Sequence, residues 1–142
     1  MKFWDSSAVV PLLVQQSASA RMEAYFREDA AVIVWWGTKV ECDSAIARLE
    51  REHQLEPAGA AEAFRRLDAI SSLWHEVQPV DVLRESARRM LRLHSLRAAD
   101  SLQLAAAFMA SENRPSTLEF VCLDERLAAA AEREGLQVLG FR

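Results

Sequence analysis

Short apolar segments alternate with helix-forming segments along this chain, and this alternation constrains its fold more than any other feature. The apolar segments cover residues 2–5, 31–35, 118–123 and 136–139, with residues 77–80 as a candidate fifth strand. The continuous β-branched and aromatic run at 31–35 is typical of a strand covered on both faces. Short strands separated by helices predict an α/β fold in which helices flank a parallel sheet. Such sheets bind ligands beyond the carboxyl ends of their strands, so chemistry is expected there.

Helices are predicted between these strands. They cover residues 6–13, 19–27, 38–53, 57–74, 81–94, 98–111 and 124–134. In the first helix Ser6 or Ser7 is expected to be the cap, and Pro11 is tolerated only in a first turn. Gly135 is expected to end the last helix at its C′ position. No repeat or Gly/Ser linker divides the chain, so residues 1–142 are predicted to form one domain.

Composition excludes several classes of protein. With 51% hydrophobic and 27% charged residues, the chain is too apolar to be a disordered tail. It has no apolar run near the roughly 18 residues of a membrane span and no signal segment, which predicts a soluble, cytoplasmic protein without a membrane partner. The two cysteines, Cys42 and Cys122, are too few for a zinc cluster and are expected to be reduced. The net charge of −4 argues against a nonspecific nucleic-acid binder, but not against an enzyme whose site needs clustered acids.

Four acids occupy matching places in the predicted elements. Asp5 and Asp124 end strands, whereas Glu41 and Asp100 lie in the first turns of helices. Each acid alone has an ordinary structural explanation. Thr38 and Glu41 fit a capping box, Asp124 fits an N-cap, and Asp100 complements a helix dipole.

The four acids together favour a site. Asp100 enters an otherwise apolar helix, and Asp5 directly follows strand residues. Carboxylates brought to one sheet edge repel each other, and burial raises the cost of their charge. Either they lie far apart or a cation compensates them. Oxygen ligands without histidine or cysteine favour Mg²⁺ or Mn²⁺ over zinc.

The sequence around these acids resembles a known family. The blocks are Phe3-Trp4-Asp5-Ser6-Ser7-Ala8-Val9, Val40-Glu41 with Ser44-Ala45, Leu96-Arg97-Ala98-Ala99-Asp100-Ser101-Leu102-Gln103-Leu104-Ala105, and Val121-Cys122-Leu123-Asp124-Glu125-Arg126-Leu127. Their order and spacing resemble those of the PIN-domain ribonucleases, and most of all the VapC-type toxins of bacterial toxin–antitoxin systems. The resemblance covers residues 3–127, and residues 135–138 resemble the family's last strand.

The resemblance implies a three-layer α/β/α fold with a short central parallel sheet. It implies that Asp5, Glu41, Asp100 and Asp124 form an acidic metal site with catalytic function. Ser7 matches a polar position that helps to order the site, and Cys122 stands where the family commonly has Thr or Ser.

The implied activity is Mg²⁺-dependent hydrolysis of RNA phosphodiester bonds by an endoribonuclease toxin, with Mn²⁺ as an alternative cation. Asp5 and Asp100 are expected to be the central ligands. Asp124 is expected to complete the site or hold a metal-bound water, and Glu41 to act through water or position the nucleophile. The implied partners are the RNA substrate, a cognate antitoxin and a second copy of the chain. The alternatives are a metal-dependent 5′-nuclease or phosphoesterase acting on other nucleic acid, and a catalytically silent RNA- or protein-binding module.

Two surfaces are candidates for contacts with partners. Five arginines (84, 88, 89, 92 and 97) and one acid lie between Arg84 and Arg97, a local charge of +4. A solvated helix face explains most of this strip as well as phosphate contacts do, but Arg97, three residues from Asp100, is the predicted RNA-binding residue. The apolar residues Val9, Leu12, Leu13, Met22 and Phe26 exceed what one sheet face needs, which suggests a homodimer or antitoxin interface.

Overall fold

The computed structural model, which describes residues 1–141, contains one five-stranded sheet in the order β3-β2-β1-β4-β5. All neighbouring strands are parallel. The strands are β1 (Lys2–Trp4), β2 (Val32–Trp35), β3 (His75–Val77), β4 (Glu119–Cys122) and β5 (Gln137–Gly140). The helices are α1 (Ser6–Leu13), α2 (Ser19–Glu28), α3 (Thr38–Arg51), α4 (Pro57–Ser71), α5 (Asp81–Leu93), α6 (Ala98–Ala110) and α7 (Glu125–Arg133), with a 3-10 turn at Pro115–Thr117. Of the predicted domain over residues 1–142, Arg142 lies outside the described residues.

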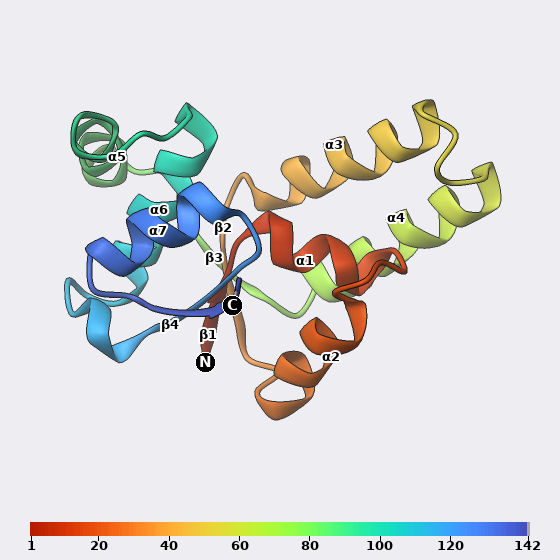
Figure 1. Cartoon of the computed structure of the whole chain (residues 1–142), viewed down its shortest axis with the longest axis horizontal. Helices are drawn as coiled ribbons and strands as arrows, with labels where there is room; N and C mark the ends of the chain where they lie inside the picture. Colours follow the sequence, from red (N-terminus) through yellow and green to blue (C-terminus); the bar gives the residue numbers. More distant parts are fainter. Residues whose placement is uncertain (142) are drawn as a thin grey trace.

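Helices cover both faces of this sheet (Figure 1), and each face carries its own hydrophobic core. Successive strand residues point to opposite faces, so Phe3 packs with α5, α6 and α7 while Trp4 packs with α1 to α4. On the first face Phe3 stacks on Phe120 with ring centroids 5.5 Å apart. Burial on both faces explains why residues 3–4 of β1, the whole of β2 and residues 120–122 of β4 are apolar without interruption. The predicted three-layer α/β/α fold is confirmed.

The third strand begins earlier than predicted. Residues 77–80 are the predicted strand, whereas β3 covers His75–Val77 and pairs Val77 with Trp35 of β2. Pro79 has no N–H to donate to a ladder, which explains why the strand does not extend over it. The helix predicted to residue 74 ends at Ser71. Leu73 is therefore 80% exposed, while Trp74 is buried and donates its ring N–H to Glu76.

The start of α1 also differs from the prediction. Asp5, and neither Ser6 nor Ser7, is the N-cap, because its carboxylate accepts a hydrogen bond from the Ser7 N–H. The expectation that Pro11 lies in the first turn is wrong, since it lies in the second turn of this eight-residue helix. The helix ends two residues later, so the missing N–H of Pro11 deprives only the Ser7 carbonyl of its helical partner.

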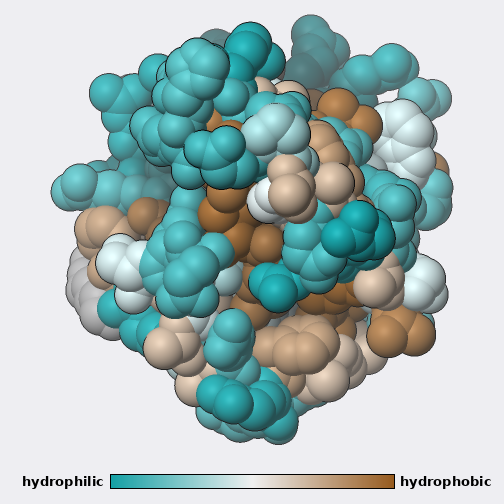
Figure 2. Space-filling model, turned by 90° about the vertical axis from the view of Figure 1, so that its right-hand side faces the viewer, coloured by the Kyte–Doolittle hydropathy of each residue, from teal (hydrophilic) through white to brown (hydrophobic). Residues whose placement is uncertain are grey.

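The apolar residues proposed as an interface are mostly part of the chain's own core. Val9, Leu13 and Met22 are buried inside it, and only Leu12 and Phe26 remain half-buried. Figure 2 shows the face to which α2, α3 and α4 contribute, where apolar side chains lie in a hollow with a polar rim. No helix among the described residues is long and apolar enough to cross a membrane.

Candidate active site

The site lies where the chain changes direction in the sheet. From β1 the chain builds outward through β2 and β3, and then returns to add β4 on the other side of β1. The carboxyl ends of β1 and β4 therefore form a topological switch point, the usual ligand position in such sheets. Asp5 directly follows β1, and its N–H donates to the Val121 carbonyl of β4 over 3.0 Å. Asp124 follows β4 by two residues.

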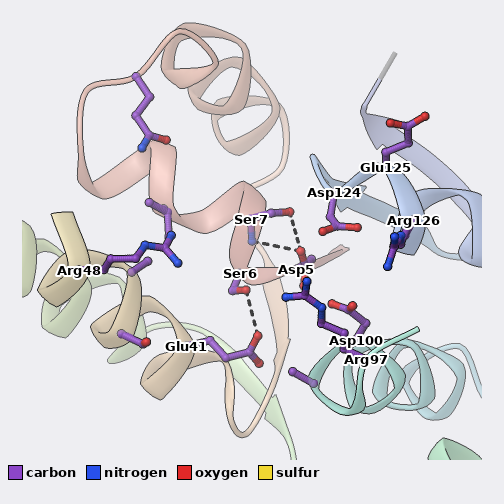
Figure 3. A pocket seen from close by; sticks show the side chains of 15 residues that line it. Asp5, Ser6, Ser7, Glu41, Arg48, Arg97, Asp100, Asp124, Glu125 and Arg126 are labelled. Atoms are coloured by element: carbon purple, nitrogen blue, oxygen red, sulfur yellow. Dashed lines mark hydrogen bonds between the residues drawn. The ribbon is translucent and has the colours of Figure 1, made fainter. Parts of the chain in front are cut away.

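The structure places all four predicted acids around one cavity of about 870 Å³ (Figure 3). Asp5 lies between Asp100 and Asp124, and Glu41 lies across the cavity on α3. Helices α1, α3, α6 and α7 all begin at this cavity. The partial positive charge of a helix N-terminus stabilises nearby carboxylates, and four such termini offset part of their repulsion. The metal-binding and catalytic roles of the acids stay predictions.

Asp5 is the most buried of the four acids. It is only 4% exposed, and its Oδ2 accepts hydrogen bonds from Ser7 Oγ at 2.5 Å and Ser7 N at 3.1 Å. Burial raises the pKa of Asp5 to about 6, and the charges of Asp100 and Asp124 raise it further, against the lowering effect of the Ser7 hydrogen bonds. Asp5 thus remains a costly carboxylate at neutral pH, which a cation would stabilise.

Ser7 and Cys122 connect Asp5 to the end of β4. The Ser7 hydroxyl accepts from the Leu123 N–H at 2.9 Å while it donates to Asp5. The Cys122 thiol donates to the Asp124 backbone oxygen at 3.4 Å and lies 3.8 Å from Asp5 Oδ2. Burial raises the pKa of this thiol, so it stays protonated. Cys122 therefore supports the backbone of Asp124 rather than its carboxylate, whose Oδ1 caps α7 by accepting from the Leu127 N–H.

Glu41 is not part of a capping box. Gly37 is the N-cap of α3, and the Glu41 carboxylate instead accepts from Ser6 Oγ at 3.1 Å and from Gln103 Nε2 at 3.0 Å. Burial raises the pKa of Glu41 to about 7, with a further contribution from the charge of Asp5. Its carboxylate is thus held in the site by side chains from α1 and α6.

Gln103 is a part of this arrangement that sequence reasoning missed. It is fully buried and donates to Thr38 Oγ1 as well as to Glu41, each at 3.0 Å. Its position one turn after Asp100, as a lone amide on an otherwise apolar helix, is the signal that points to it in the sequence. An ionised carboxylate can only accept hydrogen bonds, so the contact with Glu41 requires the NH2 group of the Gln103 amide to face it.

Asp100 lies in the first turn of α6 beside basic residues. Burial raises its pKa and so does the charge of Asp124, while a hydrogen bond from the Arg97 backbone and the charges of Arg97 and Arg126 lower it. Arg48, Arg97 and Arg126 all line the cavity, which places the predicted RNA-binding residue Arg97 next to the acids. The sequence did not predict that Arg48 and Arg126 also line the site.

The rest of the predicted arginine strip lies away from this cavity. Arg84 pairs with Asp81 at 2.9 Å and Arg88 with Glu85 at 3.1 Å on the exposed face of α5. None of the α5 arginines lines the cavity with the acids. Because Asp81 pairs with Arg84, the strip is less basic than the residues between Arg84 and Arg97 alone indicate.

The side chains of the cavity are chemically suited to a hard cation. Carboxylate oxygens are the ligands that Mg²⁺ prefers, and Mg²⁺ commonly takes one or two of them while it keeps several waters. Within residues 1–141, no three His, Cys, Asp or Glu side chains converge tightly enough to hold an ion as they stand. Two carboxylates such as Asp5 and Asp100 satisfy the usual Mg²⁺ requirement, so the residues fit this cation.

Comparison with known proteins supports the predicted resemblance. No protein-family model matches the chain. The chain is 27% identical over 139 residues to Ribonuclease VapC45 of Mycobacterium tuberculosis (strain CDC 1551 / Oshkosh), a match that covers 96% of this chain and 92% of that protein. Ribonuclease VapC49 of Mycobacterium tuberculosis (strain ATCC 25618 / H37Rv) matches with the same identity and coverage.

Two crystal structures share the fold. PAE2754 from Pyrobaculum aerophilum aligns with a TM-score of 0.66 at 20% identity, covering 96% of this chain and 87% of that one. FitAcB from Neisseria gonorrhoeae aligns with a TM-score of 0.67 at 16% identity, covering 98% of this chain and 96% of that one. The predicted resemblance is therefore confirmed: the chain is similar over 96% of its length to two proteins named VapC ribonucleases, and it shares its PIN-like α/β/α fold with the two crystal structures.

Proposed function

We propose that this chain is a metal-dependent endoribonuclease that cleaves RNA phosphodiester bonds as the toxin of a toxin–antitoxin system. The observation that carries the proposal is the set of four carboxylates, from four separate segments, around one cavity at the sheet's switch point. Burial raises the pKa of three of them, as expected where acids are retained for chemistry at a cost in stability. The sequence relatives named ribonucleases support the choice of RNA as substrate.

The proposed roles follow from how each side chain is held. Asp5 and Asp100 bind the cation, and Asp124 completes the site from the N-terminus of α7. Ser7 positions Asp5 through its hydroxyl and its N–H. A bound Mg²⁺ supplies Lewis-acid activation of water and neutralises charge on the phosphodiester.

Glu41 and Arg97 act at opposite sides of the reacting phosphate. Glu41, held by Ser6 and Gln103, accepts a proton from the attacking water or orients it through hydrogen bonding. The Arg97 guanidinium, which lines the cavity beside Asp100, binds phosphate oxygens.

The test is cleavage of RNA by the purified chain and by Asp5→Asn, with Asp43→Asn as the control. Asp43 lies on α3 but does not line the cavity. We expect wild type and Asp43→Asn to cleave total RNA with Mg²⁺ or Mn²⁺ and to stop when EDTA is added. Asp5→Asn should lose at least about a hundredfold in rate, in line with removal of a principal electrostatic group.

Three results would overturn the proposal. Equal cleavage by Asp5→Asn and wild type would remove Asp5 from the mechanism. Cleavage of single-stranded DNA with no cleavage of RNA would favour the 5′-nuclease alternative. Absence of any cleavage, with RNA binding retained, would favour a silent binding module.

A cognate antitoxin and a homodimer are part of the same proposal. The half-buried apolar side chains of the α1–α4 layer, Leu12 and Phe26 among them, offer apolar surface for such contacts. Co-expression with the product of an adjacent small reading frame, followed by light scattering, should give a complex larger than the 16.0 kDa chain. A monomer at micromolar concentration with no co-purified product would contradict this part of the proposal.

A further inference from the structure

The cavity extends beyond the acids along one face of α3. Glu41, Ser44, Ala45 and Arg48 all line it, at the i, i+3, i+4 and i+7 spacing of a single helix face. Arg48 lies seven residues after Glu41, which is about 10 Å along the helix axis at 1.5 Å per residue. Gln16, from the segment after α1, lines the cavity too. The far end of this groove is thus polar, with a guanidinium in place of carboxylates.

Arg48 differs from the other two arginines of the cavity in its surroundings. Arg97 and Arg126 lie near Asp100, where their charges lower its pKa. Figure 3 shows Arg48 on the opposite side of the cavity from Asp124 and Arg126, with its side chain extending from α3 toward α1. Arg48 is exposed and takes part in none of the ion pairs formed within residues 1–141. Its charge is therefore available to an anion from outside the chain.

We propose that Arg48 and Gln16 form a subsite for the phosphate of a nucleotide adjacent to the cleaved bond. The inference rests on the proposed function and names a contact that positions its RNA substrate. Arginine binds phosphate oxygens through paired N–H donors, and the Gln16 amide supplies a further donor. Because Arg48 is about two helical turns from Glu41, the phosphate it contacts is not the one that reacts.

Charge placement explains why such a subsite is needed. The centre of the cavity is acidic and repels a polyanion until a cation is bound. Arginines on both sides, Arg97 and Arg126 near α6 and α7 and Arg48 on α3, hold neighbouring phosphates and keep the strand across the acids. RNA affinity therefore depends on Arg48 even when no metal is present.

The test measures binding apart from cleavage. A fluorescein-labelled single-stranded RNA oligonucleotide is titrated with wild type, Arg48→Gln and Arg51→Gln in EDTA, at several salt concentrations, with fluorescence anisotropy as the readout. Arg51 is the matched control, because it ends the same helix, carries the same charge and does not line the cavity. Both side chains lie at the exposed surface, so circular dichroism melting should give similar Tm values for all three proteins.

We expect Arg48→Gln to bind RNA about five- to tenfold more weakly, with Arg51→Gln within about twofold of wild type. The slope of log affinity against log salt should fall by about 0.7 for Arg48→Gln, the loss of one phosphate contact on a single strand. With Mg²⁺ present, Arg48→Gln should raise KM for the oligonucleotide more than it lowers kcat, whereas Arg51→Gln should leave both close to the wild-type values.

The outcomes separate this inference from the proposed function. If the slope of log affinity against log salt is equal for Arg48→Gln and Arg51→Gln, the subsite is overturned even if RNA is cleaved. In that case Arg48 would be assigned to contact with a protein partner instead. An Arg48-dependent slope without cleavage would support the subsite and overturn the proposed function. Absence of RNA binding by wild type would overturn the subsite as well.

Discussion

Asp5 is almost completely buried, and its carboxylate lies near the charges of Asp100 and Asp124. Its pKa is raised from 3.8 to about 6 in the folded chain, and that of Glu41 from 4.5 to about 7. Between the unfolded and folded pKa values the folded chain binds more protons than the unfolded chain. The free energy of unfolding therefore falls as pH rises from about 4 to about 7, and both groups act in the same direction.

Asp5→Asn should stabilise the metal-free protein at high pH. Asparagine keeps an acceptor for the Ser7 N–H and remains a good N-cap, but it carries no charge. In EDTA at pH 8 we expect its free energy of unfolding to exceed that of wild type by about 2–3 kcal/mol, from a shift of about two pKa units. The difference should disappear near pH 4. Urea denaturation at both pH values measures it, and a variant less stable than wild type at pH 8 would contradict the assignment of Asp5 as a strained carboxylate.

Replacing Gln103 should affect activity more than stability. Gln103→Met keeps the volume but removes the donor to Glu41 and Thr38, and should cost about 1 kcal/mol of unfolding free energy. Without that donor Glu41 is less well oriented, so we expect kcat to fall about tenfold or more.

The control for this prediction is Thr38→Val, which removes the other acceptor of the Gln103 amide and leaves its contact with Glu41. Its stability loss should be similar, whereas its kcat should change by less than about threefold. Equal kcat losses in both variants would mean that Gln103 supports folding only.

The four acids were predictable as single residues because each occupies a strand end or a helix N-terminus that local pattern identifies. The hydrogen-bond partners of these acids were not predictable from the sequence. Gln103 meets Thr38 across 65 positions of sequence, and such contacts depend on how α3 and α6 pack. Arg48 was missed for the same reason, since nothing local distinguishes it from Arg51.

At the scale of elements, apolar content decided which predictions held. β1, β2 and β4 are buried on both faces and were found from their sequences. The predicted position of β3 begins two residues too late in the sequence. This strand is short, half-exposed and at the sheet edge, where it is defined by its pairing with β2 rather than by hydrophobicity. Pro11 shows that a short helix tolerates a proline in its second turn when the helix ends shortly afterwards.

Two glycines give a matched test of element geometry. Gly135 follows α7 with φ of +94°, as its predicted C′ position requires, and an added Cβ would lie 3.3 Å from Pro115. Gly135→Ala should therefore destabilise the protein by about 1–2 kcal/mol. Gly59 lies within α4, where an added Cβ meets only Leu55 at 3.5 Å, so Gly59→Ala should stabilise it by about 0.5–1 kcal/mol. Thermal denaturation compares the stabilities of the two variants with that of wild type. Stability changes of the same sign in both variants would contradict these assignments.

At the scale of the whole molecule, the placement of charge matters more than its sum. The net charge of −4 argues against a nonspecific nucleic-acid binder, but it does not reveal that acids line the centre of one cavity with Arg48, Arg97 and Arg126 around them. The α/β alternation predicted the parallel sheet and the location of the site at the carboxyl ends of its strands. It did not predict the strand order, which depends on the return of the chain from β3 to β4 and creates the switch point.

The four acids are proposed to form a shared site for a divalent cation, and calorimetric titration with Mn²⁺ tests this proposal most directly. Wild type and Asp43→Asn should bind Mn²⁺ with similar affinity, and Asp100→Asn should bind at least about tenfold more weakly, because it removes one of two principal carboxylates. In thermal melts, Mn²⁺ should stabilise wild type and Asp43→Asn but not Asp100→Asn. Equal Mn²⁺ affinity in Asp100→Asn and wild type would contradict the claim that the acids form a shared metal site.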